Sequence, residues 1–275
     1  MKKILYNGYY ILSFFIVILV SCLIYFTMFF KLDSEKSFFK NINYIGHATY
    51  GIDNIDYTNS KESLKFGYDK GIRVMEVDFL FTSDDELVLN HYWMGNTWES
   101  SEHFLESKVN NVYTPMSLSD LLEYMDEYED LYIIIDTKEN EYDNNKSIYD
   151  VYKKIVNETL EYDSKLLDRF IVQIYGFNDL KIINDIHDFE NKMFSMYKLG
   201  DRFNIASVVY YCLYNDIDSL VIPYTHIMYN LLDEKDINFI RSKGINVYVN
   251  TINDKTLYKE LVKMGVTGVY TDFLN

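Results

Sequence analysis

Apolar stretches along the chain predict a series of short strands, and two of these strands are close neighbours in the sequence. Residues 74–81 and 87–91 are both strand-like, with the turn-forming sequence Ser-Asp-Asp at 83–85 between them. So short a gap cannot hold the helical crossover that parallel strands need, so these two strands must form an antiparallel hairpin. Folding about the turn places Asp78 opposite Asn90, to within one residue of register.

The same pattern continues to the end of the chain as strands separated by helix-length segments. Besides 74–81, strand-like stretches lie at 44–46, 131–138, 170–174, 193–197, 220–222, 245–249 and 268–270. Helical periodicity covers 62–70, 116–128 and 148–160, with Gly71 as a C-cap and Ser117 and Ser119 as N-cap candidates. Eight parallel strands with helices between them predict an α/β fold of the (β/α)8 TIM-barrel type.

Three carboxylates stand at strand positions that favour a metal site. Glu76 and Asp78 are one residue apart, so they point to the same face of their strand. Strand 131–138 ends in Asp136 and Lys138, which again share a face, and buried strands that end in charged residues are typical of a barrel with its active site there. Crowded carboxylates repel unless a cation lies between them, and oxygen ligands suit Ca2+ or Mg2+. Spacing alone leaves open whether Lys138 serves the site or only pairs with Asp136.

Histidines flank this acidic group in the sequence. His47 follows the first predicted strand, and the hairpin brings His91 toward Glu76 and Asp78. Two histidines beside a metal site supply what phosphodiester cleavage needs, namely one group that accepts a proton and one that returns it. The alternative is that the carboxylates are solvated strand residues and the histidines are incidental. The occurrence of all four in one short arrangement argues against that alternative.

At these residues the chain resembles the glycerophosphodiester phosphodiesterase family, within the phosphatidylinositol-phospholipase-C-like TIM-barrel superfamily. That family has a His-Arg-Gly opening, a Glu-Asn-Thr helix start, a Glu-x-Asp strand, a strand that ends in His-Asp, a Glu-x-Lys strand and a closing Gly-Val-Asp-Gly-Ile-x-Thr-Asp. The corresponding segments, in order from about residue 42 to the end of the chain, are 47–49, 58–60, 76–78, 91–92, 136–138 and 265–272. The Glu-x-Asp strand, the hairpin histidine and the closing motif are fairly specific when they occur together.

The resemblance implies a metal-dependent phosphoric diester hydrolase that acts on glycerol- or polyol-phosphate diesters, in lipid head groups or in wall polymers. Its site residues would be Glu76, Asp78 and Asp136 as ligands of Ca2+ or Mg2+, and His47, His91 and Lys138 as catalytic residues. In the implied mechanism His47 takes the proton of a substrate hydroxyl that attacks phosphorus, and His91 protonates the departing alcohol. Water then opens the cyclic phosphate, and Lys138 offsets charge at the phosphate.

Three departures from the family pattern concern the phosphate-binding and metal-binding positions. Ala48 replaces a phosphate-binding arginine, Thr58 replaces the glutamate of Glu-Asn-Thr, and Asp136 replaces a third metal-binding glutamate. The first two losses fit together, because a glutamate without its cationic neighbour would be one more uncompensated carboxylate. Two alternatives to the hydrolase stay open: a lyase of the same fold that releases a cyclic phosphate from lysolipids or sphingolipids, and a non-catalytic module that binds polyol-phosphate polymers.

Other polar residues carry weaker signals. Residues at further strand ends are interpreted as barrel-rim positions: Gln173, Tyr175, Tyr197 and Asn250. The remaining histidines fall in predicted loops or helices and are interpreted as surface or locally bonded side chains away from the carboxylates: His103, His187 and His226.

The N-terminal segment predicts a membrane anchor. Residues 9–30 run for about 22 positions without a charge, a length that spans a bilayer. Lys2 and Lys3 precede it and the charges after it are balanced, so the positive-inside rule places the N-terminus in the cytoplasm and the catalytic domain outside. A lipoprotein lipidated at Cys22 and a cleaved secretion signal are the alternatives. Bulky residues after Cys22 argue against the first, and the lack of a small-x-small site argues against the second.

Domain organisation and charge complete the prediction. Residues 1–40 would form the anchor and juxtamembrane segment, and 41–275 a single TIM-barrel domain of the size that this fold needs. The net charge of −16 disfavours nucleic acid and anionic lipid surfaces as partners. Cys212 is the only cysteine besides Cys22, so an exported domain would have no internal disulfide. The expected partners are a phosphodiester substrate and, through the anchor, a membrane.

Overall fold

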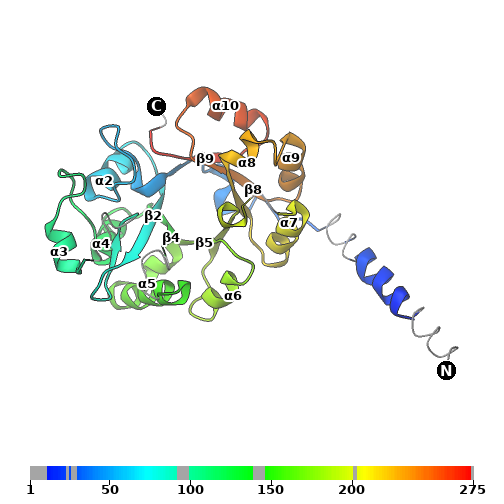
Figure 1. The fold of residues 1–275 in the computed structure, drawn as a ribbon, viewed down its shortest axis with the longest axis horizontal. Coiled ribbons are helices and arrows are strands. Elements are labelled where there is room, and N and C mark those ends of the chain that lie inside the picture. The colour runs from blue at the N-terminus through cyan, green and yellow to red at the C-terminus, as the bar shows by residue number, and fades with distance from the viewer. Residues whose placement is uncertain are drawn as a thin grey trace.

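The strands form one sheet that closes on itself and is surrounded by helices (Figure 1). The structure is a computed structural model, and it describes residues 11–22, 25, 30–91, 99–138, 146–200 and 203–273. Its strands are β1 Tyr44–Gly46, β2 Val74–Phe81, β3 Leu87–Leu89, β4 Tyr132–Thr137, β5 Phe170–Ile174, β6 Asn191–Ser195, β7 Ser219–Pro223, β8 Asn246–Asn250 and β9 Gly268–Thr271. All pairings except β2–β3 are parallel, and β1 pairs with both β2 and β9. The predicted (β/α)8 barrel is therefore confirmed.

The antiparallel arm β3 has the predicted register against β2. Phe79 pairs with Leu89, and the Asn90 N–H donates to the Asp78 carbonyl oxygen at 3.0 Å. His91 comes directly after this last ladder bond. The hairpin therefore delivers His91 to the carboxyl end of the barrel through a local turn.

Helices connect the strands on the outside of the barrel. They are α2 Lys61–Asp69, α3 Ser101–Glu106, α4 Leu118–Glu127, α5 Ile148–Tyr162, α6 Asp179–Asn184, α7 Ile205–Tyr214, α8 Tyr224–Met228, α9 Glu234–Ser242 and α10 Lys255–Lys263, with short 3-10 segments η1 Phe38–Asn41, η2 His47–Thr49, η4 Ser164–Arg169 and η5 Tyr197–Leu199. Several N-termini are closed by capping boxes, in which a side chain accepts from the third helical N–H and that residue's side chain accepts in return.

Two local predictions need correction. The cap of α4 is Ser117, which forms a capping box with Asp120, while Ser119 lies inside the helix. Strand β6 lies two residues earlier than predicted, because its ladder with β5 starts at Asn191. Tyr197 is consequently not a strand residue but the first residue of η5.

The barrel interior is filled at its amino-terminal end by one buried residue from most strands and by Phe39 of η1. The interior cluster consists of Phe39, Ile45, Val74, Ile134, Ile171, Met193, Val221, Tyr248 and Tyr270. The Tyr248 hydroxyl donates to the Phe39 carbonyl oxygen at 2.7 Å, which fixes η1 beneath the strands. Since this end is packed, any site must open at the opposite end, where the strands end.

The chain enters the barrel domain at this packed end. The Leu32 N–H donates to the Lys243 carbonyl oxygen at 2.8 Å, just before β8, so contacts with the barrel start before the predicted boundary at residues 40 and 41. Residues 11–22 are helical and lie outside the barrel (Figure 1). Among the described residues, none of the helices has the length and apolar character needed to cross a bilayer. The predicted anchor at 9–30 lies partly outside those residues.

Candidate active site

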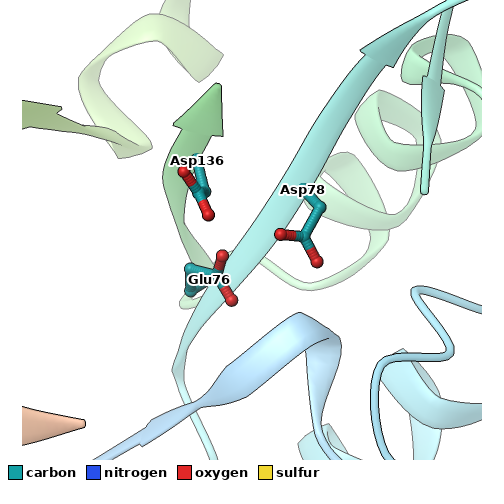
Figure 2. Close-up of side chains that lie close together, drawn as sticks. All are labelled: Glu76, Asp78 and Asp136. Atoms are coloured by element: carbon teal, nitrogen blue, oxygen red, sulfur yellow. The ribbon is translucent and has the colours of Figure 1, made fainter. Parts of the chain in front are cut away.

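Three carboxylates meet where β2 and β4 run side by side (Figure 2). Parallel pairing sets Asp78 next to Asp136, and Glu76 lies two residues before Asp78 on the same face. One oxygen from each of the three side chains lies within 4.8 Å of the others. Glu76 and Asp78 are buried, and Asp136 is largely so. The geometry expected from the sequence, two carboxylates on one face and a third from the next strand, is thus present.

Lys138 provides positive charge to this group. Its Nζ lies 2.6 Å from Asp136 Oδ2 and 2.9 Å from Asp78 Oδ1, so it pairs with both aspartates and not with Asp136 alone. Burial by itself would lower the pKa of Lys138, but the three carboxylates raise it above its usual range, so the side chain is an ammonium ion. One ammonium does not neutralise three carboxylates.

The electrostatics of the carboxylates reflect this excess of negative charge. Burial and the charges on Asp78 and Asp136 raise the pKa of Glu76 well above its ordinary value. Burial also acts to raise the pKa of Asp78, but Lys138 and the nearby histidines outweigh it and lower that pKa. An additional cation beside Glu76 would offset this excess and favour the ionised form of its side chain.

A hard divalent ion fits this donor set. Carboxylate oxygens are the ligands that Ca2+ and Mg2+ prefer, and bonds of about 2.4 Å to Ca2+ allow ligands up to about 4.8 Å apart. Asp78 Oδ1 is buried and accepts no hydrogen bond from the described residues, although Lys138 Nζ lies 2.9 Å away. The described residues thus provide the oxygen donors together with an excess of negative charge, which a divalent ion would neutralise.

His47 is held by a carboxylate from the opposite end of the sequence. Its Nδ1 lies 2.8 Å from Asp272 Oδ1, and the Asn253 amide donates to the other oxygen of Asp272 at 2.9 Å. The Asp272 N–H in turn donates to Asn253 Oδ1 at 2.8 Å. Because Nδ1 faces Asp272, Nε2 is the nitrogen left for chemistry in the cavity. Burial acts to lower the pKa of His47, but the hydrogen bond and charge of Asp272 raise it.

His47 and His91 both contact the ring of Tyr57. The Tyr57 ring centroid is 4.6 Å from that of His47 and 4.5 Å from that of His91, and both contacts are edge-on. Burial lowers the pKa of His91 below its ordinary value, and Lys138 adds to this effect while Asp78 opposes it. Burial and the charges of Asp272 and Asp78 raise the pKa of Tyr57 to about 12, so its hydroxyl stays protonated and can donate.

The positions where the chain departs from the family pattern have structural partners of their own. The Ala48 N–H donates to Glu76 Oε2 at 2.7 Å, from a left-handed backbone with φ of 46°. Asn59 makes two bonds to Asp78: its amide donates to Oδ2 at 2.7 Å, and its Oδ1 accepts the Asp78 N–H at 3.2 Å. Thr58 is buried and its hydroxyl lies 3.1 Å from Ser60 Oγ. Small side chains therefore occupy both positions of the lost Arg–Glu pair. Of the described residues that line the cavity, Lys138 is the one lysine and none is an arginine.

These groups border a cavity of about 420 Å³ at the carboxyl end of the barrel. Its walls include the predicted rim residues Gln173, Tyr175, Tyr197 and Asn250. The Tyr175 hydroxyl donates to Asp136 and accepts from Gln173, while the Tyr270 hydroxyl donates to Gln173 Oε1 at 2.8 Å. This chain of bonds fixes the Asp136 carboxylate from the side away from Lys138.

The other histidines lie away from this cavity, as expected. His187 contacts Phe189, and His103 lies 3.8 Å from Glu99. His226 is buried and stacks on Phe203 with ring centroids 5.0 Å apart, so of the two alternatives it is a locally packed side chain and not a surface one.

Sequence reasoning did not assign a role to Asp272, Asn253 or Tyr57. Asp272 directly follows the last strand in the closing Thr-Asp motif, so its position at a strand end was a usable signal. The position of Tyr57 in the sequence gives no comparable signal, because Tyr57 lies in a loop and not at a strand end. It reaches the histidines from a left-handed backbone conformation with φ of 53°.

Comparison with known proteins is consistent with this geometry. The sequence model of the glycerophosphoryl diester phosphodiesterase family matches residues 47–275. Comparison with curated proteins gives no match. Among solved structures, a candidate glycerophosphodiester phosphodiesterase from Galdieria sulphuraria has a TM-score of 0.69 at 16% identity, covering 84% of this chain and 94% of that one. An enzyme of that name from Parabacteroides distasonis has a TM-score of 0.65 at 16% identity, covering 85% and 93%.

A third structure, a phosphodiesterase from Oleispira antarctica in complex with the product sn-glycerol-3-phosphate, has a TM-score of 0.65 at 17% identity and covers 84% of this chain and 93% of that one. At such identities the solved structures establish the shared barrel fold. The match over residues 47–275 goes further, since it includes the segments that carry both histidines, the three carboxylates and Asp272. The chain therefore belongs to the glycerophosphoryl diester phosphodiesterase family, a family of phosphoric diester hydrolases.

Proposed function

We propose that the protein hydrolyses diesters of glycerol phosphate, or of a similar polyol phosphate, with a divalent metal and the acid–base pair His47 and His91. The observation that carries this proposal is the convergence at one cavity of the three-carboxylate cluster, His91, and a His47 held by Asp272. The Oleispira antarctica phosphodiesterase was solved with sn-glycerol-3-phosphate as its product, which supports glycerol phosphate as one half of the substrate.

Glu76, Asp78 and Asp136 would hold the ion, Ca2+ or Mg2+. When bound, it would supply positive charge that lowers the pKa of a substrate hydroxyl and stabilises negative charge on the phosphate. Lys138 adds a further positive charge beside the same carboxylates, although an ammonium cannot make the bidentate contact of the arginine that Ala48 replaces.

The first half of the reaction transfers two protons through the histidines. His47 accepts at Nε2 the proton of the substrate hydroxyl, whose oxygen forms a bond to phosphorus. The bond from phosphorus to the departing alcohol breaks, and His91 donates its proton to that oxygen. Asp272 stabilises the imidazolium that forms on His47, and the lowered pKa of His91 makes its protonated form a stronger acid.

The second half restores both histidines. His91, now neutral, takes a proton from water, and the water oxygen bonds to phosphorus. The ring oxygen leaves phosphorus and receives the proton held by His47. The products are a phosphate monoester and a free alcohol, and each histidine ends in the protonation state in which it started.

A 31P NMR time course tests this function. The purified full-length chain is incubated with glycerophosphoglycerol and millimolar Ca2+, Mg2+ or Mn2+, and then with excess chelator. We expect the diester signal to give way to a monoester signal, with conversion stopped by the chelator. A cyclic phosphate signal that persists would establish a lyase instead, and a diester signal unchanged with each of the three metals would support a binding module.

We also infer that residues 9–30 anchor the protein in a membrane with the barrel outside the cytoplasm. The uncharged length of the segment and the preceding Lys2 and Lys3 support this orientation. The contact of Leu32 with Lys243 lies at the packed amino-terminal end of the barrel, opposite the cavity. With the anchor on that side the cavity opens away from the bilayer, which favours soluble diesters or wall polymers over lipids of the same membrane.

A further inference from the structure

A second cavity lies directly beside the first, and the proposed function does not use it. It also measures about 420 Å³, and its described walls come from the loop before α2, the end of the β2–β3 hairpin and the segment that contains α3. Of the described residues, Tyr57 and His91 are the two that line both cavities. The pair therefore acts as a partition between them.

The partition distinguishes the two histidines. His47, Glu76 and Asp136 line only the first cavity, whereas His91 faces the first and the second. Displacement at phosphorus is in line, so the attacking and departing oxygens lie on opposite sides of the phosphorus atom. When the attacking hydroxyl is at His47, the departing alcohol extends toward His91 and beyond it. The second cavity is the space that lies in that direction.

The lining of the second cavity matches hydroxyl groups. Besides Tyr57 and His91, its polar lining consists of neutral side chains that both donate and accept, namely Asn90, Asn110, Asn111 and Ser107, and of the charged side chains Asp56, Glu99 and Lys108. An alcohol hydroxyl also does both, and it can donate to a carboxylate and accept from an ammonium group, so each of these polar side chains can bind a polyol. Asn110 and Asn111 form a tight turn with φ of 50° and 62°, and this turn is closed by the bond from the Tyr113 N–H to the Val109 carbonyl oxygen at 2.9 Å.

We propose that the second cavity is the binding subsite for the departing alcohol and that it selects a group rich in hydroxyls, such as a second glycerol. This inference rests on the proposed phosphodiesterase function and adds to it the class of group on the far side of the scissile bond. The two cavities together then hold the two sides of one diester, with phosphorus at the partition.

The test compares one diester that fills the subsite with one that does not. The substrates are glycerophosphoglycerol and the methyl ester of glycerol phosphate, and the variant is Asn110→Gly with Asn111→Gly. Glycine keeps the left-handed backbone of the turn while it removes both amides. Asn230→Gly is the matched control, because Asn230 is an exposed asparagine with φ of 55° on another loop.

We expect wild type to favour glycerophosphoglycerol in kcat/KM by roughly tenfold or more, the value of one or two net hydrogen bonds. In the double glycine variant this ratio should fall toward one, with the methyl ester rate unchanged, and the Asn230→Gly ratio should equal that of wild type. A ratio near one in wild type, a stronger preference for glycerophosphocholine, or equal losses on both substrates in the double variant would overturn the subsite.

Measurements of binding affinity test the subsite independently of the proposed hydrolase activity. Calorimetry on metal-loaded His47→Ala protein gives the Kd of each diester without turnover. A preference for glycerophosphoglycerol that disappears in the double glycine variant supports the subsite even when no diester is cleaved by wild type, in which case the hydrolase proposal alone fails. Equal Kd values for the two diesters would overturn the subsite whatever the turnover.

Discussion

Asp272→Asn is the substitution that isolates the contribution of the His47–Asp272 pair. Asparagine keeps the shape of the side chain and removes its charge. The pair is poorly accessible to solvent, since the His47 side chain is 13% exposed and that of Asp272 4%. Screening by water is therefore weak, and the hydrogen bond of 2.8 Å between a carboxylate and an imidazolium retains its strength.

The expected magnitude follows from that bond. A hydrogen bond to a charged group contributes about 1.5–3 kcal/mol, and here it favours the protonated form of His47. Burial lowers the pKa of His47 and Asp272 raises it, so in the variant, where only the charges of Asp78 and Asp136 still oppose burial, the pKa should fall. The asparagine amide can also donate to Nδ1, which would place the proton on Nε2 and prevent it from accepting. We therefore expect kcat to fall by roughly 10²–10⁴-fold.

Three measurements check this prediction. NMR titration of the His47 imidazole gives its pKa directly, and the limb of the pH–rate profile that His47 governs should move to lower pH by the same amount. The pKa of His47 is higher in the folded protein than in the unfolded chain, where it is about 6.5. Protonated His47 therefore stabilises the fold at pH values below about 6.5, and this stabilisation is lost as the pH rises through the folded-state pKa. The loss in the free energy of unfolding should therefore be greater at pH 5.5 than at pH 8.5.

Two further variants serve for comparison with Asp272→Asn, one as a milder perturbation of the same pair and one as a control. Asn253→Ala leaves the Asp272 charge in place but removes two of its hydrogen bonds, so it should cost less activity and move the His47 pKa less. Asp168→Asn, at an exposed carboxylate, should behave as wild type. An Asp272→Asn protein with an unchanged His47 pKa and turnover within threefold of wild type would refute the reasoning.

The remaining predictions concern the metal, the acid and the membrane. Asp78→Asn should weaken divalent-ion affinity and abolish the rise in Tm that millimolar Ca2+, Mg2+ or Mn2+ gives to wild type; the absence of any such rise in wild type would contradict the metal site. His91→Ala should lose several orders of magnitude on diesters with an alkoxide leaving group but little on a nitrophenyl ester, which needs no proton; equal losses on both would contradict its role as acid. Protease added to intact cells should digest the barrel domain, and protection until lysis would contradict the orientation inferred from Lys2 and Lys3.

Local sequence patterns were sufficient to predict the barrel and most of the carboxylate cluster. Alternation places Glu76 and Asp78 on one face, and parallel pairing with a common end brings Asp136 next to Asp78. The hairpin is similarly local, since a turn of few residues fixes the bond between Asn90 and Asp78 and so the place of His91. These features depend on short-range geometry that residue types specify.

The rest of the site depends on contacts that no local pattern encodes. His47 and Asp272 are 225 positions apart and meet only because β1 pairs with β9 to close the barrel. Tyr57 reaches both histidines from a left-handed conformation that bulky residues seldom adopt, so its identity gives no hint of its position. The second cavity needs three separate segments to come together around His91.

The most direct test of the central claim, that His47 and His91 act as one acid–base unit at a metal site, is kcat/KM for glycerophosphoglycerol in wild type, His47→Ala, His91→Ala and the double variant. Each single variant should lose at least roughly 10³-fold with fold and metal affinity retained, and the double variant should be hardly worse, because groups that act together are non-additive. His103→Ala, at an exposed histidine, serves as the control. Small losses at both sites that multiply in the double variant would contradict the account.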